Sequence, residues 1–298
     1  FINAPSTLSG IALTSVCRGK NIPIVGFQHG VTKEICATHD EMMIGYESNY
    51  SDMVVSYNEY ATIASNESDF AFGSSVTVGM SKRHQRMKSS SIFMSNEYPI
   101  VYVSTNLYKG NIGLFGTYLT DYGRSLNEQN LISDVLSKIP HKILYKAYPE
   151  HYQRYLDDDP ILLGIKDTKN IEIYTKKIDM RYLVASHRVF ITSKATSTLG
   201  WLVMSGKPVI FINWEDNMPL TKEAYILIKN GLFLFDGNSK ESMNELRLFL
   251  STPINKIEFL WQKKSSDRKI MIKKLFSSNS FESGKRAASI IKEKYISN

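Results

Sequence analysis

Short apolar runs alternate with segments of helical periodicity along most of the chain. In the first 95 residues the apolar runs cover Ile22–Phe27, Met53–Ser56 and Val76–Val78. A helix is expected over Pro5–Arg18, where apolar and small residues recur at helical spacing: Leu8, Ile11, Ala12, Ser15 and Val16. Strands that alternate with helices are typical of a parallel sheet with crossover helices, so this region is predicted to be an α/β unit.

The polar segment KSSSIFMSNEYP interrupts this alternation and predicts a domain boundary. Beyond it, helices are expected over Thr198–Ser205 and over Asp121–Lys138, whose apolar stripe would hold Leu126, Leu131, Val135 and Ile139. Strands are expected at Ile100–Ser104, Ile143–Lys146, Asn170–Lys176, Val189–Thr192 and Val209–Ile212. The repeated order of strand, helix and strand is the doubly wound pattern. From Glu241 onward the chain is expected to be helical and basic, without strands.

These patterns divide the 298 residues into three parts: 1–95, 96–240 and 241–298. The opening FINAPSTLSG has no initiator Met, and it lacks the basic start and apolar core of a signal peptide. We therefore expect that an upstream part of the protein is missing and that the first domain is incomplete or unusually small. No window has the roughly 20 apolar residues of a membrane helix. Cys17 and Cys36 are too few for a disulfide framework, so a reducing cytoplasm is the expected setting.

The chain carries a net charge of +7, and its basic residues are densest near the C-terminus. These residues are Lys256, Lys263, Lys264, Arg268, Lys269, Lys273, Lys274, Lys285 and Arg286. They could form a solvated helix face, or a face that meets anionic phospholipid. A nucleic-acid binder would account for the charge, but not for the spread of lysines along the chain or for the hydroxyl-rich turn described next.

That turn, Thr192–Thr198, lies between an expected strand and an expected helix. It contains five hydroxyl residues and Lys194. The N–H groups at a helix N-terminus bind anions such as phosphate, while hydroxyls add donors and a lysine adds charge. The alternative is simple N-capping by Thr196 or Ser197, although one cap needs only one hydroxyl. The following SGKP is interpreted as the turn into the next strand, because it lacks the spacing of a Walker loop.

Three further strand ends carry polar residues. In GFQHG, His29 follows an apolar run and suits general-base chemistry, and Glu34, Asp40 or Glu41 could orient its imidazole or act itself. In YKAYPEHY, Tyr148 could stack on a nucleotide base, although a surface loop with a lone His151 is the alternative. In NWEDNMPLTKEAY, Glu215, Asp216 and Glu223 could accept sugar or ribose hydroxyls, or form a solvated acidic loop.

The sequence lacks the motifs of several common kinds of site. The six histidines are scattered, no HxxxH or CxxC pair occurs, and a metal site is therefore not expected. There is no GxGxxG after a strand and no GxSxG elbow, so neither a dinucleotide cofactor nor a hydrolase triad is indicated.

The order of GFQHG, VYVST, YKAYPEHY and ITSKATSTLGWLVMSGKPVIFIN resembles the GT-B glycosyltransferases of bacterial surface polysaccharide assembly. The resemblance covers about Pro5 to Asp236, and the CDP-glycerol glycerophosphotransferase and the CMP-Kdo and CMP-sialic-acid transferase branches are most similar. It implies two Rossmann-like doubly wound domains with a central cleft. Residues 1–95 would be the C-terminal part of the acceptor-side domain, and 96–240 would bind the nucleotide donor.

The resemblance also implies roles for residues. His29 matches the acceptor-side histidine, flanked by Gln28 and Gly30, and would be a base or a substrate contact. Pro149 matches the proline of a His-Pro element that holds the donor nucleotide, although Tyr148 stands where the histidine is expected. The matches to the phosphate-binding turn are Ser193, Thr196, Ser197 and Thr198. Glu223 lies where many GT-B enzymes use a carboxylate.

The sequence therefore predicts a metal-independent glycosyltransferase that uses a nucleotide-activated sugar, CMP- or CDP-linked, as substrate and needs no cofactor. The sugar would be Kdo or a nonulosonic acid, and the acceptor a cell-surface glycan or a lipid-linked molecule. The expected location is the cytoplasm, with a peripheral position on the inner membrane face as an option through the C-terminal basic residues. The alternatives are a CDP-glycerol-type glycerophosphotransferase, a sugar-nucleotide epimerase and a non-catalytic binding module of the same fold. Nucleic acid is not an expected partner.

Overall fold

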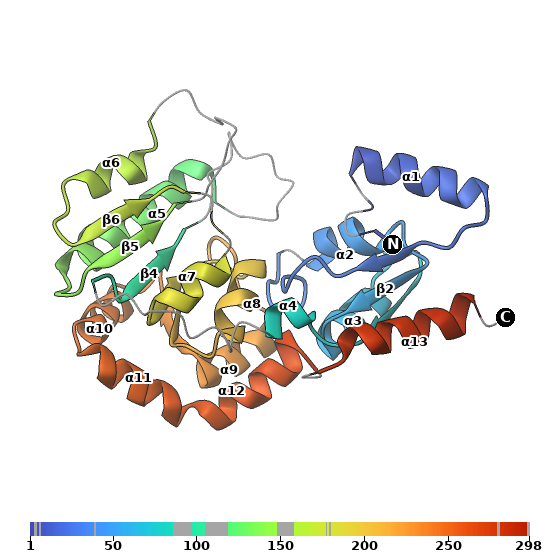
Figure 1. Cartoon of the computed structure of the whole chain (residues 1–298). Helices are drawn as coiled ribbons and strands as arrows, with labels where there is room; N and C mark the ends of the chain where they lie inside the picture. Colours follow the sequence, from blue (N-terminus) through green and yellow to red (C-terminus); the bar gives the residue numbers. More distant parts are fainter. Residues whose placement is uncertain are drawn as a thin grey trace.

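The structure is a computed structural model that describes residues 1–2, 5, 7–38, 40–85, 97–104, 119–147, 158–176, 178, 180–278 and 281–296. It has two α/β lobes that lie side by side (Figure 1). We call the part built on residues 7–85 the first lobe and the part built on residues 97–278 the second lobe. The predicted α/β class with parallel sheets and a helical C-terminus is confirmed.

The first lobe contains a parallel sheet with the strand order β1-β2-β3. Its elements are α1 (Leu8–Gly19), β1 (Val25–Phe27), α2 (Asp40–Ser48), β2 (Met53–Ser56), α3 (Glu59–Asn66), β3 (Ser74–Thr77) and α4 (Lys82–Gln85). Strand β1 is shorter than the predicted Ile22–Phe27. Pro23 cannot donate a ladder hydrogen bond, and the backbone N–H of Ile24 donates to Asp52 Oδ2 instead.

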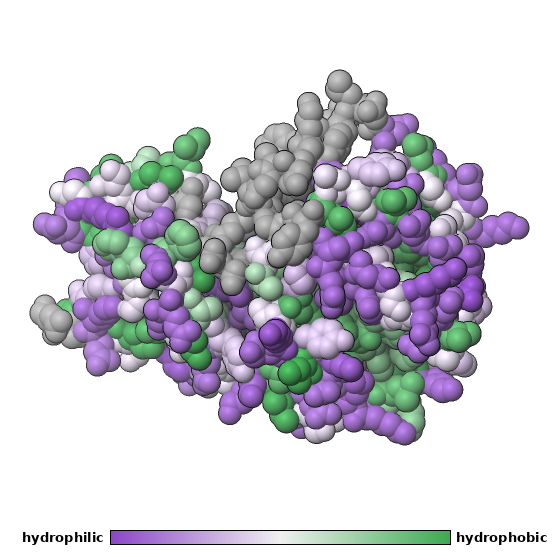
Figure 2. Space-filling model, turned by 180° about the vertical axis from the view of Figure 1, so that it is seen from behind, coloured by the Kyte–Doolittle hydropathy of each residue, from purple (hydrophilic) through white to green (hydrophobic). Residues whose placement is uncertain are grey.

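Helix α1 has the predicted position, but its predicted apolar face is wrong. Leu8 and Val16 are 90% and 58% exposed, and the buried positions of the helix are Gly10 and Thr14. Hydrophobic surface is visible along the upper edge of this lobe in Figure 2. The periodicity identified the helix correctly but could not determine which face the rest of the lobe covers.

The second lobe contains a six-stranded parallel sheet with the order β6-β5-β4-β7-β8-β9. Its strands are β4 (Ile100–Val103), β5 (Ile143–Lys146), β6 (Ile171–Tyr174), β7 (Val189–Thr192), β8 (Val209–Asn213) and β9 (Phe233–Asp236). Numbered from β4, this is the order 3-2-1-4-5-6 of the doubly wound Rossmann fold. The order reverses between β4 and β7, and ligands of such sheets bind at the carboxyl ends of the strands at this switch point.

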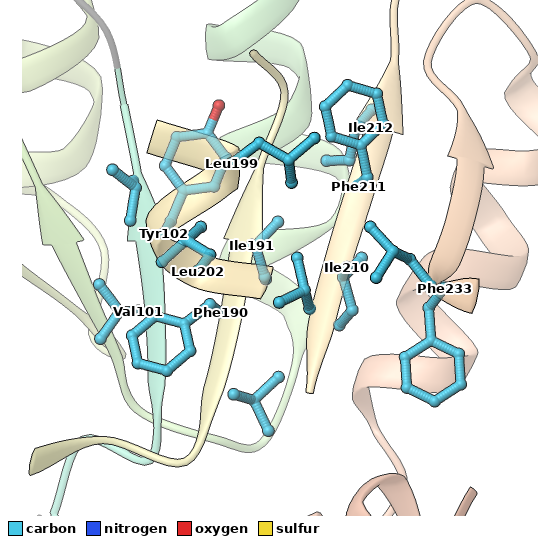
Figure 3. Packing of buried hydrophobic residues seen from close by; sticks show 14 of the residues in the cluster. Val101, Tyr102, Phe190, Ile191, Leu199, Leu202, Ile210, Phe211, Ile212 and Phe233 are labelled. Atoms are coloured by element: carbon cyan, nitrogen blue, oxygen red, sulfur yellow. The ribbon is translucent and has the colours of Figure 1, made fainter. Parts of the chain in front are cut away.

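Helices connect the strands of the second lobe. They are α5 (Asp121–Asp134), a 3-10 turn (Leu136–Lys138), α6 (Pro160–Lys166), α7 (Met180–Ser186), α8 (Ser197–Met204) and α9 (Lys222–Gly231). The centre of the core consists of β7 and β8, whose residues are all buried, with Leu199 and Leu202 of α8 packed on them (Figure 3). These fully buried, mostly apolar strands fit a parallel sheet covered by helices on both faces.

Two details of the second lobe differ from the prediction. Leu126 is 43% exposed, so the buried stripe of α5 includes Leu131 but not Leu126. Strand β9 was not predicted, because its residues are only partly buried at the sheet edge. The predicted boundary segment lies largely outside the described residues, since the structure describes none of 86–96.

The C-terminal helices connect the two lobes. Their bounds are α10 (Lys240–Leu250), α11 (Ile254–Lys263), α12 (Ser265–Met271), a π-helical turn (Ile272–Phe276) and α13 (Ser283–Tyr295). Trp261 and Met271 belong to the core of the second lobe, whereas Ala287 and Ile291 of α13 pack in the small core of the first lobe. Figure 1 shows the chain crossing back in this way. Among the described residues, none of the helices has the length and apolar character to cross a membrane.

The return of α13 should stabilise the first lobe. Replacing Ile291 by Ala removes buried methyl groups from its small core, so we expect a loss of about 2 kcal/mol in the free energy of unfolding. Lys292→Ala is the matched control, because Lys292 is exposed on the same helix, and it should change stability by less than about 0.5 kcal/mol. Urea denaturation followed by circular dichroism measures both. Equal effects would contradict the packing of α13 on this sheet.

Candidate active site

Loops from the two lobes meet at Gly30 and Ser197. Gly30 follows β1, and Ser197 is the first residue of α8 after β7. A methyl group built on Gly30 would lie 2.4 Å from Cβ of Ser197. The close approach therefore requires glycine at position 30. It brings together the two motifs that the sequence analysis singled out, although 167 residues separate them (197 minus 30).

The residues after Gly30 fasten this loop to the second lobe. Val31, Ile35 and Cys36 are buried in the large core, together with strands of the second lobe. The carbonyl of Ile35 accepts a hydrogen bond from the N–H of Thr221, and the N–H of Ala37 donates to the carbonyl of Pro219. The position of the loop against α8 is thus set by packing and by backbone pairing.

His29 lies at the exposed edge of this junction. Its side chain is exposed, and its ring meets the ring of Tyr46 edge-on at 6.2 Å. The imidazole forms no hydrogen bond with the part of the chain that the structure describes, while its backbone N–H donates to Glu47 Oε1 at 2.6 Å. The backbone is therefore fixed and the ring is available to a ligand.

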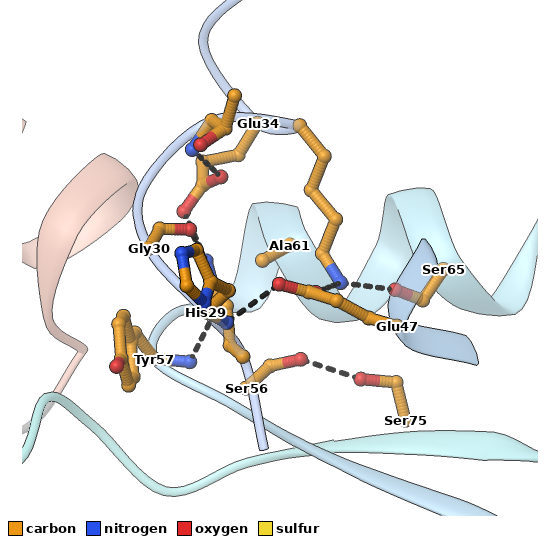
Figure 4. Close-up of polar contacts among 12 residues, drawn as sticks. His29, Gly30, Glu34, Glu47, Ser56, Tyr57, Ala61, Ser65 and Ser75 are labelled. Carbon is orange, nitrogen blue, oxygen red and sulfur yellow. Dashed lines mark hydrogen bonds and ion pairs between the residues drawn. The ribbon is translucent and has the colours of Figure 1, made fainter. Parts of the chain in front are cut away.

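Gln28 and Glu34 are buried and hold the loop in shape. Figure 4 shows Glu34 near Gly30. Gln28 Nε2 donates to the carbonyl of Gly30 and to Glu34 Oε1, and Gln28 Oε1 accepts from the N–H of Tyr57. Glu34 also accepts from Asn58 Nδ2 at 2.8 Å and from the N–H of Thr32. Burial raises the pKa of Glu34.

This geometry removes the support for Glu34 as a catalytic residue and for Gln28 as a substrate contact. Both side chains are nearly inaccessible, at 4% and 2% exposure, and their oxygens are occupied by donors of the first lobe. Sequence reasoning identified the acidic residue near His29, but it could not show that the chain turns this carboxyl inward.

The turn after β7 lies at the switch point of the large sheet. Val103 of β4 and Thr192 of β7 are register partners at the carboxyl ends of their strands. Thr196 is the N-cap residue of α8, yet its side chain makes no capping hydrogen bond. Within the described residues, the hydroxyls of Ser197 and Thr198 are also without partners, and all three side chains are partly exposed. Simple N-capping therefore does not explain this turn.

Lys194 lies in the same turn and is 5% exposed. Burial and the nearby Arg124 lower its pKa to about 7, against the opposing effects of Glu128, Asp121 and Asp216. Its ammonium group forms no ion pair with any described residue. A buried ammonium group without a paired carboxylate favours an anionic ligand.

Buried polar side chains of β4, β5 and α5 lie between the turn after β7 and the sheet. Ser193 Oγ lies 3.4 Å from the hydroxyl of Tyr102, whose ring stacks on that of Tyr145. Glu128 of α5 accepts hydrogen bonds from the hydroxyls of Tyr145 and Ser104. Burial raises the pKa of Glu128. Ser193 is thus 5% exposed and closer to the sheet than the hydroxyls of α8.

The loop after β8 adds unsatisfied acceptors that the sequence analysis recognised only in part. Asn213 Oδ1, Asp216 Oδ1 and Asn217 Oδ1 are buried and have no hydrogen-bond partner among the described residues. The signal for Asn213 and Asn217 was their position at a strand end in NWEDN. Glu223 is exposed in the first turn of α9, two residues after the interlobe contact of Thr221.

Several predicted residues fall elsewhere. Tyr148 and Pro149, with His151, lie outside the described residues, so their predicted nucleotide contact stays a prediction. Lys207 of SGKP donates to the carbonyls of Val184, Ala185 and His187. This bonding caps α7, and the segment leads into β8 as expected.

Five of the C-terminal basic residues have partners in the structure. Lys264 donates to the carbonyls of Lys229 and Asn230, Arg268 stacks on Trp261, and Arg286 donates to the carbonyl of Val78. Lys285 pairs with Glu282, and Lys263 lies over the ring of Phe259, but both lysines are exposed, as are the other lysines singled out in this region. Contact with an anionic membrane stays a prediction. Within the described ranges, no three His, Cys, Asp or Glu side chains form a group that could hold a metal ion.

A scan against models of protein families gives no match, and neither does a search of curated proteins. Solved structures are similar in fold. A glycosyltransferase from Rickettsia africae has a TM-score of 0.57 at 14% identity, covering 100% of this chain and 85% of its own. The UDP-forming α,α-trehalose-phosphate synthase from Burkholderia vietnamiensis has a TM-score of 0.54 at 10% identity, and the match covers 94% of this chain and 70% of the synthase. HepE from Anabaena in complex with UDP has a TM-score of 0.52 at 13% identity, and the match covers 95% of this chain and 76% of HepE.

These neighbours are GT-B glycosyltransferases, so the chain has the GT-B fold. The expectation of two Rossmann-like parts is thereby confirmed at the level of the fold. At these identities the likeness establishes the fold alone, and the function has to be argued from the site.

The contact between Gly30 and Ser197 is testable by a double mutant. Gly30→Ala should lower the melting temperature by several degrees, because the new methyl group would clash with Ser197. Adding Ser197→Gly should recover most of this loss. Gly164→Ala serves as control, since nothing lies within 4 Å of its added methyl group. A Gly30→Ala loss that Ser197→Gly leaves unchanged would contradict the contact.

Lys194 should make stability depend on pH. Its pKa is about 7 in the folded chain and near 10.5 when exposed, so the unfolded chain binds more protons between these values and stability rises with pH there. Below pH 7 the cost of burying the charge is complete. Lys194→Met should therefore raise the melting temperature more at pH 6 than at pH 9. An equal gain at both pH values would contradict this account.

Proposed function

We propose that the protein is a glycosyltransferase that moves a sugar from a nucleotide-activated donor to an acceptor hydroxyl. The observation that carries the proposal is the meeting of His29–Gly30 with the N-terminus of α8. A group with a basic ring nitrogen stands on one side of this junction, and an anion-binding helix terminus stands on the other.

The donor phosphate would bind at the start of α8. The hydroxyls of Thr196, Ser197 and Thr198 and the N–H groups of the first turn are the donors there, and Lys194 supplies charge. Ser193 supports the turn through Tyr102. Such an arrangement stabilises the negative charge that develops on a departing nucleotide phosphate. We propose on this ground that transfer needs neither a metal ion nor a cofactor.

The sugar would lie beside this phosphate, where the loop after β8 offers acceptors. Asn213 and Asn217 each have a buried oxygen without a partner among the described residues, and so has Asp216. Sugar hydroxyls are the donors that such oxygens require. Glu223 and the pair Tyr148–Pro149 stay proposed contacts of the donor, in keeping with the resemblance.

His29 would take the proton from the acceptor hydroxyl. The acceptor oxygen would then bond to the anomeric carbon while the bond from this carbon to the phosphate oxygen breaks. An exposed imidazole with its own backbone fixed suits this task. We propose a cell-surface glycan or lipid-linked acceptor from the resemblance alone.

The nucleotide is the least constrained part of the proposal. The resemblance favours a cytidine nucleotide and an acidic sugar such as Kdo, whereas the HepE structure holds UDP. Calorimetric titration with CMP, CDP, UDP and GDP separates these options. A preference for CMP or CDP would support the cytidine branch, and a preference for UDP would support the transferase while correcting its donor.

Ser197→Ala tests the site itself. Loss of one hydrogen bond to a charged phosphate should weaken the preferred nucleotide about tenfold to a hundredfold. Ser265→Ala is the matched control, because Ser265 is also a partly exposed first residue of a helix, α12. It should leave the affinity unchanged. Failure of all four nucleotides to bind, with the melting temperature intact, would argue against the transferase and favour a binding module of the same fold.

A further inference from the structure

Glu47 connects two points of the loop that carries His29. Its Oε1 accepts the backbone N–H of His29 at 2.6 Å, and its Oε2 forms an ion pair with Lys33 Nζ at 2.9 Å. Glu47 lies near the end of α2, while His29 and Lys33 lie on either side of the bend at Gly30. Figure 4 shows the Glu47 carboxylate between His29 and Ser65 of α3.

The ion pair is buried. The side chains of Lys33 and Glu47 are each 1% exposed, and Lys33 Nζ also donates to Ser65 Oγ of α3 at 2.8 Å. A buried ion pair rarely adds much stability over an apolar pair of the same shape, but it fixes geometry when its hydrogen bonds are complete. Lys33 of the loop is thus bound to both α2 and α3, through Glu47 and Ser65.

Other side chains hold the rest of the loop, but they do not hold His29. Gln28 holds the carbonyl of Gly30, and Glu34 holds the N–H of Thr32. Neither bond reaches His29, whose backbone N–H is held by Glu47. The direction in which the imidazole leaves the loop therefore depends on Glu47 more than on the other two carboxyl or amide groups.

We propose that Glu47, oriented by Lys33, is a positioning residue that directs His29 toward the junction with the N-terminus of α8. The inference rests on the proposed role of His29 and deepens it. Catalytic groups lose efficiency steeply when displaced, and a shift of about 1 Å can cost a factor of about 100 in rate. Toward His29 the carboxylate acts by accepting one backbone N–H, so a neutral acceptor in the same place should suffice for this contact.

The variants are chosen to separate positioning from stability. Glu47→Gln turns an amide towards the Lys33 ammonium group, so we expect it to displace the loop. The double variant Glu47→Gln with Lys33→Met keeps an acceptor for His29, removes both charges and leaves Ser65 Oγ to receive the new amide N–H. Asp52→Asn is the control, because Asp52 Oδ2 accepts the N–H of Ile24 at the same 2.6 Å, at the other end of β1.

The first readout is hydrogen exchange at the His29 amide, which needs no substrate. Exchange should be at least about tenfold faster in Glu47→Gln and should return close to the original rate in the double variant. Asp52→Asn should leave it unchanged. An unchanged rate in Glu47→Gln would overturn the inference.

The second readout is release of UDP from UDP-glucose and of CMP from CMP-sialic acid, with water as acceptor, for whichever donor is turned over. Glu47→Gln should lower kcat by about tenfold to a hundredfold with little change in KM, and the double variant should recover it.

In a His29→Ala background, Glu47→Gln should have no further effect. If the two losses multiply instead, Glu47 acts independently of His29 and the inference is wrong while the role of His29 stands. If His29→Ala leaves turnover unchanged, or if neither donor is turned over, the proposed role of His29 fails and the inference fails with it.

Discussion

The approach of Gly30 to Ser197 is the constraint on which the candidate site depends. No side chain fits at position 30, since a methyl group on Gly30 would lie 2.4 Å from Cβ of Ser197. The contact joins the end of a strand in one sheet to the start of a helix on the other. The loop that carries His29 and the N-terminus of α8 thereby lie at the same junction, although each belongs to a lobe with its own sheet.

Much of the remaining structure holds this junction in place. The loop after Gly30 enters the large core through Val31, Ile35 and Cys36. In addition, α13 returns to the first sheet, and Asn58 Nδ2 donates both to Glu34 and to the carbonyl of Leu275 in the π-helical turn. Single π-helical turns are frequent at functional sites. The lobes are thus joined by buried contacts at the loop after Gly30 and at the π-helical turn.

The sequence predicted the sheet of the second lobe well, because a parallel sheet buried on both faces leaves uninterrupted apolar runs. Ile143–Lys146 and Val189–Thr192 have the predicted bounds. Burial was predicted less well where it depends on neighbours distant in sequence. The apolar positions of α1 face solvent, and Glu34 faces inward, because periodicity reports one face of an element and not what covers it.

The candidate site likewise contains residues that the sequence predicted and residues that only the structure revealed. The hydroxyl turn and His29 were recognisable because residues of suitable chemistry follow apolar strands. The buried Glu47 and Lys33 gave no such signal, since each is an ordinary charged residue in sequence and their pairing spans 14 residues. Asn213 and Asn217 became candidates only when the structure showed their oxygens buried without partners among the described residues.

The central claim is that the donor phosphate binds at the N-terminus of α8 and that His29 acts on the acceptor at the same junction. The most direct measurement is a crystal structure of the chain with the nucleotide that it binds most tightly. The account predicts a phosphate group at the first-turn N–H groups of α8, in contact with the Ser197 hydroxyl, with the His29 ring facing the same space. A nucleotide bound away from the carboxyl ends of β4 and β7, or a phosphate that leaves Ser197 and Lys194 without contact, would contradict it.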